Sequence, residues 1–95
     1  MYLQQLNSPD ERARADAAMQ LGRMKSRRAV EPLTQTLGGD RSPAVREAAA
    51  RGLGLIGAPA ALTALQRAAQ ADDDRDVRHS ASFAAEVIRS NLRGR

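Results

Sequence analysis

Few side chains in this chain could perform acid–base, nucleophilic or metal chemistry. The 95 residues include one histidine, His79, and no cysteine, so a zinc or thiolate centre would lack most of its usual ligands. A calcium loop needs a glycine at its sharp turn and a glutamate at its end, and the acidic run Asp72–Asp76 has neither. This run instead predicts a solvated turn in which Asp74 caps the following helix.

The glycines do not form a phosphate-binding loop either. Gly52, Gly54 and Gly57 are not preceded by a strand pattern and are not followed by Lys-Ser or Lys-Thr. We therefore expect no catalytic residue, no metal ligand set and no cofactor, and we predict that the protein is not an enzyme.

The chain repeats itself at a shift of 32 residues without a gap. VREAAARGLG at 45–54 is in register with RADAAMQLG at 14–22 and with VRHSASFAAEVI at 77–88. The shift aligns Arg14, Arg46 and Arg78. A period of about 20 to 50 residues is typical of solenoids, in which a single unit cannot bury its own apolar face. The repeat therefore predicts a solenoid, independently of the helix or strand propensity of any single stretch.

Each repeat contains two stretches with helical periodicity. Ser42 suits an N-cap, Pro43 suits the first helical position, and Gly54, Gly57 and Pro59 are expected to loosen and then stop that helix. Pro32 lies inside the second stretch, so that helix should start late or have a distorted first turn. The predicted helices are Pro9–Met24, Arg28–Leu37, Pro43–Ile56, Pro59–Ala71 and Asp74–Leu92, with a short stub at Tyr2–Leu6.

The repeat also resembles a known family. The pattern D-x5-R-x2-A-A-x2-L-G followed by A-x3-L resembles the HEAT-like repeats of the phycobilisome-lyase type; it is formed here by Asp40, Arg46, Ala49, Ala50, Leu53, Gly54, Ala61 and Leu65. The resemblance implies an all-α fold, a right-handed α–α superhelix of about two and a half to three helical hairpins. The single domain would cover 1–95, with repeat units at about 9–39, 40–71 and 72–95 after a helical stub at 1–7.

The same resemblance allows a test for an iron site. In the related deoxyhypusine hydroxylases, such repeats carry adjacent His-Glu pairs that bind iron, and several pairs must converge from different repeats. Here His79 is followed by Ser80, and the equivalent positions are Ala15-Asp16 and Glu47-Ala48. The ligands are too few for that site, and we expect His79 to be a partly exposed helix residue.

The repeated arginine has a structural explanation. Asp40 precedes Arg46 by six residues, and Asp72 precedes Arg78 by the same distance. We predict that each pair forms an ion pair that joins an inter-repeat loop to the next helix and also satisfies backbone carbonyls.

Binding of a protein partner is the function we expect, with the module acting as a scaffold or adaptor. In this class of repeat the second helix usually lines the concave surface, so its polar face is the predicted interface. That interface consists of Gln4, Arg28, Glu31, Gln35, Thr63, Arg67 and Gln70. We also expect self-association through Phe83 and Val87 on the last helix, with Tyr2, Leu3 and Leu6 as the alternative contact.

Charge supports a second function class. The net charge is +4, and basic residues gather at Arg23, Lys25, Arg27 and Arg28 and again at Arg89, Arg93 and Arg95, so binding to nucleic acid is the alternative. One Tyr, one Phe and no Trp leave little for base stacking, which favours the protein partner. A bilin-lyase-related or chaperone-like role is a third alternative.

The N-terminal sequence and the apolar runs bear on location. The start MYLQQLNSPDER lacks the basic residues and the apolar stretch of a signal peptide, and no apolar run approaches the roughly 18 residues of a membrane span. From the sequence we expect a soluble, cytoplasmic protein without a membrane partner.

Overall fold

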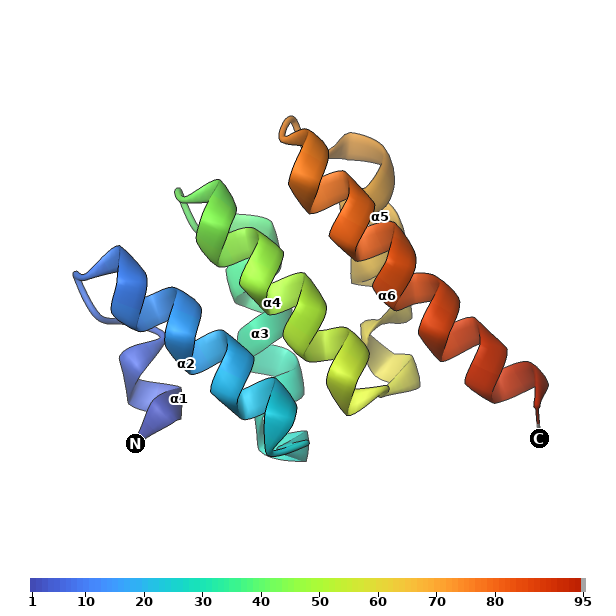
Figure 1. Ribbon diagram of the computed structural model, residues 1–95, viewed down its shortest axis with the longest axis horizontal. Coiled ribbons are helices and arrows are strands. Elements are labelled where there is room, and N and C mark those ends of the chain that lie inside the picture. The colour runs from blue at the N-terminus through green and yellow to red at the C-terminus, as the bar shows by residue number, and fades with distance from the viewer. Residues whose placement is uncertain (95) are drawn as a thin grey trace.

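Residues 1–94 are described by a computed structural model, and their regular structure is helical. The α-helices pack in two layers (Figure 1): α2, α4 and α6 lie side by side, α3 and α5 lie behind them, and α1 packs against α2. The elements are α1 (Tyr2–Gln5), α2 (Glu11–Arg23), η1 (Arg27–Ala29), α3 (Val30–Gly39), α4 (Pro43–Ile56), η2 (Pro59–Ala61), α5 (Leu62–Ala71) and α6 (Arg75–Arg93). The fold is the predicted all-α solenoid, and we call α2, α4 and α6 the front layer.

Side-chain caps begin the three front helices. The hydroxyl of Ser42 accepts a hydrogen bond from the Val45 amide, and the carboxylate of Asp74 accepts one from the Val77 amide, as the sequence predicted. Asp10 does the same for α2, which therefore begins at Glu11 rather than at Pro9. At the other end of α4, Gly57 has the left-handed φ of 74° that ends a helix.

The back helices begin later than their predicted bounds, and the late start expected for the helix that contains Pro32 is confirmed. Both predicted starts, at Arg28 and Pro59, lie in short 3-10 turns, and the α-helices follow at Val30 and Leu62. Pro32 occupies the first turn of α3, where the backbone amides have no intrahelical acceptor and a missing N–H costs nothing.

Small residues let the helices pack closely around a thin core. Alanines are buried along every front helix, and the largest fully buried side chains are Leu33, Leu37, Leu53, Leu65, Ile88, Val45 and Val77. A Cβ atom added at Gly22 would lie 2.5 Å from the Cα of Gly52, and one at Gly52 would lie 2.7 Å from the carbonyl oxygen of Ala18. The contact between α2 and α4 therefore requires glycine.

Gly54 has a packing role that the sequence interpretation missed. It was expected to loosen α4, but the helix continues through it to Ile56. A Cβ atom at Gly54 would lie 2.9 Å from the Cβ of Ala84, so this glycine allows α6 to approach α4. The helix stops at Gly57, three residues later.

Candidate binding surface

Arginine–aspartate ion pairs join successive repeats and hold the front layer in place. Arg14 Nε and Nη2 donate to the Asp40 carboxylate at 2.9 and 3.1 Å. Arg46 repeats the arrangement with Asp72 at 2.9 and 3.1 Å. We call these two bidentate pairs the clasps. Their side chains are almost fully buried, so the charge-assisted bonds form largely out of water.

The clasps correct the predicted pairing of Arg46 with the carboxylate of Asp40. Arg46 contacts Asp40 only through the backbone, where Nη1 donates to the Asp40 carbonyl oxygen at 2.9 Å. Its carboxylate partner lies in the next loop, 26 residues further along. Arg78 likewise donates to the Asp72 carbonyl at 2.8 Å and not to its carboxylate. The guanidinium groups of Arg14 and Arg46 each span two loops, so for these two arginines the next repeat completes the pair.

The clasps also change the acidity of the two aspartates. Burial alone would raise the pKa of Asp72, but hydrogen bonds from Arg46 and from the Asp74 amide outweigh it and lower that pKa. The pKa of Asp40 is lowered in the same way, with burial opposed by hydrogen bonds from Arg14 and the Ser42 amide. Both carboxylates are therefore held in the charged form.

The exposed face of the front layer contains a hollow of about 710 Å³, which we call the front groove. Phe83 is 73% exposed and Leu55 is 43% exposed, and both line this groove. Large apolar side chains exposed together mark interaction surfaces more often than scattered ones do. The groove is lined by Met19, Arg23, Glu47, Arg51, Gly54, Leu55, His79, Ser80, Phe83, Ala84 and Val87.

The groove follows from the repeat register. Met19, Arg51 and Phe83 are equivalent positions, one on each front helix, and the next turn places Arg23, Leu55 and Val87 in a second row. The sequence interpretation compared the buried columns of the repeat and did not compare these exposed ones. Aligning the exposed positions of the three repeats at the 32-residue shift, one helical turn after another, would have identified this surface.

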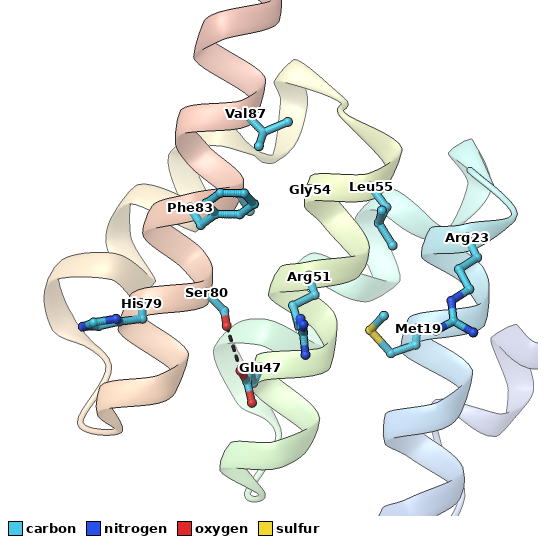
Figure 2. A pocket seen from close by; sticks show the side chains of 11 residues that line it. Met19, Arg23, Glu47, Arg51, Gly54, Leu55, His79, Ser80, Phe83 and Val87 are labelled. Carbon is cyan, nitrogen blue, oxygen red and sulfur yellow. Dashed lines mark hydrogen bonds between the residues drawn. The ribbon is translucent and has the colours of Figure 1, made fainter.

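Figure 2 shows how these side chains lie. Met19 points from α2 towards α4, Leu55 lies between α4 and α2, and the Phe83 ring lies on the side of α6 that faces α4. The Ser80 hydroxyl donates to Glu47 Oε2 at 2.8 Å and links α6 to α4 at one end of the groove. His79 points away from α4 and is exposed, in agreement with its expected position on the helix.

Two cations in the groove have no carboxylate partner. Within residues 1–94, the side chains of Arg23 and Arg51 are exposed and neither forms an ion pair. Both arginines line the groove together with Met19, Leu55 and Phe83, and Glu47 is the one carboxylate among its lining residues. The groove thus offers apolar contact area and unneutralised positive charge together.

The predicted protein-binding residues lie elsewhere, on α1, η1, α3 and α5. All seven are exposed, namely Gln4, Arg28, Glu31, Gln35, Thr63, Arg67 and Gln70. Thr63, Arg67 and Gln70 share one shallow hollow with Arg89 of α6. The other four lie on α1, η1 and α3 and do not line that hollow. This back surface stays a predicted interface.

The basic clusters differ in their partners. Arg23, Lys25, Arg27 and Arg28 are exposed around the end of α2, and Lys25 has a left-handed φ of 53° in that turn. At the other cluster Arg89 and Arg93 both bind Glu86, whose pKa is lowered mainly by the hydrogen bond from Arg93. Arg95 lies outside the described residues. Within residues 1–94, the first cluster therefore forms no ion pair, whereas the single carboxylate of Glu86 partly neutralises the second.

The predicted self-association residues also differ in exposure. Phe83 is well exposed and Val87 is half-buried, and both line the front groove beside Gly54 and Leu55 of α4. They do not lie on the outer edge of α6, where a following helix would pack. Of the alternative contacts, Leu6 is buried and Tyr2 and Leu3 pack partly against the core, so each of these side chains is less exposed than Phe83.

The described residues contain neither a cluster of metal ligands nor a candidate membrane span. Among residues 1–94, no group of three or more His, Cys, Asp or Glu side chains is placed to hold a metal ion. No helix in this range combines the length and apolarity that crossing a bilayer requires.

Comparison with known proteins agrees with the repeat architecture. The chain matches the structure of human deoxyhypusine hydroxylase in complex with glycerol with a TM-score of 0.87 and 31% identity, covering 94% of this chain and 31% of that one. The chain therefore spans about a third of the length of that enzyme. No curated protein matches it. The family described as HEAT repeats matches residues 2–86, and the chain belongs to this family.

Proposed function

We propose that this protein is a small non-catalytic scaffold that binds a protein partner through the front groove. The observation that carries the proposal is the exposure of Phe83 and Leu55 in a hollow shared by the front helices. An aromatic side chain that is largely exposed in the free protein can bury much of its area when a partner covers it. HEAT-type solenoids present such surfaces from several repeats at once.

The chemistry of the groove supports binding over catalysis. The Ser80 hydroxyl donates to Glu47, but His79 points away from α4, so among the residues that line the groove no histidine joins this pair as in a catalytic triad. The similar structure is an enzyme, but this chain corresponds to only 31% of it. Under the proposal, the shared helices serve here as a binding surface.

Cross-linking in native host cells tests the proposal and separates the two candidate faces. We expect Phe83→Ser to abolish cross-linking to the partner while the double variant Gln35→Ser, Arg67→Ser retains it. The reverse result would assign binding to the back surface. Loss of the fold is excluded by comparing helical circular dichroism, since all three side chains are exposed.

Two finer assignments belong to the same proposal. The motif from Asp40 to Leu65 supports the phycobilisome-lyase type of HEAT-like repeat, and that type is compatible with an accessory role in a larger complex. A cytoplasmic location is proposed as well, and cell fractionation of the host would test it.

Nucleic acid is the second candidate because Arg23, Lys25, Arg27 and Arg28 are exposed in one turn without ion pairs. If these side chains bound duplex DNA, affinity would fall with salt by roughly 0.9 per phosphate contact on a log–log plot. We expect no tight binding to random DNA at physiological ionic strength.

A further inference from the structure

We infer that the partner segment of the front groove is an acidic amphipathic helix. This inference rests on the proposed function and adds the chemistry of the partner. It follows from the order of side chains in the two rows that cross the front layer. The first row reads Met19, Arg51, Phe83 and the second reads Arg23, Leu55, Val87.

The apolar positions form a band that continues across the groove. Met19 on α2, Leu55 on α4 and Phe83 on α6 each line it, so a partner must contact all three helices to cover them. An amphipathic helix does this with apolar residues spaced three and four apart, the usual form of helix-in-groove recognition.

The charged side chains of the groove determine which sign of charge the partner should carry. Arg51 is the middle residue of the first row and Arg23 is the first residue of the second. Each therefore has an apolar neighbour in its own row. Glu47 is the acidic side chain among the residues that line the groove, and its Oε2 accepts a hydrogen bond from Ser80 at 2.8 Å. Carboxylates that flank the apolar anchors of the partner would complement both guanidinium groups.

The size of the groove fixes the length of the segment. Neighbouring packed helices lie about 8 to 10 Å apart, so three helix axes span about 16 to 20 Å. At 1.5 Å per residue, a helix of about 12 residues crosses them. The segment is therefore a short motif.

A second copy of this chain fits the groove less well than a separate partner does. The acidic turn Asp72–Asp76 could reach the arginines of another molecule, but it contains no large apolar side chain to cover Phe83. Two of its carboxylates are also occupied, Asp72 in a clasp and Asp74 as a helix cap. The acidic turn of a second copy would neutralise the arginines of the groove, but the apolar band would stay exposed.

Fluorescence anisotropy with a matched pair of peptides tests the inference. One labelled peptide of about 15 residues carries Leu at helical anchor spacing with Glu beside the anchors, and its pair carries Lys at every Glu position. We expect the Glu peptide to bind at least about tenfold more tightly and to weaken with added salt. The double variant Arg23→Glu, Arg51→Glu should reverse the preference, and the control Arg12→Glu, on the exposed first turn of α2, should not.

The possible results separate the inference from the function on which it rests. Equal affinity for the two peptides, a preference for the Lys peptide or no binding of either would overturn the acidic-helix inference. Sedimentation that showed a dimer lost in Phe83→Ser would overturn it too, because a second copy would then fill the groove. The proposed function fails separately, if Phe83→Ser leaves cross-linking to the native partner unchanged.

Discussion

Replacing Arg46 with alanine removes one complete clasp and should destabilise the fold measurably. Arg46 is 13% exposed and donates to Asp72 through Nε and Nη2 and to the Asp40 carbonyl through Nη1. Without it, the Asp72 carboxylate, 9% exposed, keeps one bond from the Asp74 amide. Hydrogen bonds to charged groups contribute about 1.5 to 3 kcal/mol, so the free energy of unfolding should fall by about that amount. For a domain of this size the midpoint of thermal unfolding should drop by about 6 to 24 °C.

Arg78 provides a matched control for this measurement. It occupies the equivalent position and donates to the Asp72 carbonyl, but no carboxylate in residues 1–94 completes a clasp with it. Arg78→Ala should therefore cost less than Arg46→Ala, because it removes one charge-assisted bond to a carbonyl and leaves no buried carboxylate without its guanidinium partner. Thermal melts followed by circular dichroism compare the two variants. An unchanged midpoint for Arg46→Ala, or equal losses for both, would refute the clasp as a stabilising element.

Three further predictions concern packing, pH and association. Gly52→Ala should destabilise the fold by about 1 to 3 kcal/mol in urea, since its Cβ would meet the Ala18 carbonyl, whereas Gly38→Ala enters open space and should be neutral or slightly stabilising. The pKa values of Asp40 and Asp72 are lower in the folded protein than their ordinary 3.8, so the unfolded chain takes up protons first as the pH falls. Stability should accordingly decline below about pH 5, and less steeply in Arg46→Ala, as urea titrations at several pH values would show. Sedimentation at micromolar concentration should give a monomer, because the front groove fits a separate partner better than a second copy, and a dimer that Phe83→Ser converts to monomer would instead assign the exposed ring to self-association.

The repeat register made much of the fold predictable. Ser42, Pro43 and Gly57 act through their own backbone and the adjacent turn, so local rules identified the bounds of α4 as the structure has them. The apolar columns at a 32-residue shift predicted packing of one repeat on the next. The starts of α3 and α5 were placed too early because a 3-10 turn and a first α-helical turn have similar patterns.

The contacts between repeats were harder to predict. Asp40 is six residues from Arg46 and 26 from Arg14, and proximity in sequence favoured the wrong carboxylate partner. The close approach of Gly22 to Gly52 depends on where two helices cross, which the periodicity of one helix does not specify. The front groove was missed for another reason, because its positions vary in type between repeats more than core positions such as Ala17, Ala49 and Ala81 do.

The clasps have a consequence for how this solenoid opens. Each clasp joins a helix in one repeat to the loop that begins the next. Its stabilising energy therefore contributes to the interface between two units and not to either hairpin alone. In a quasi-one-dimensional array, strong coupling between nearest neighbours makes adjacent units unfold together instead of singly. The buried carboxylates of Asp40 and Asp72 thus govern how far a local fluctuation spreads along the chain.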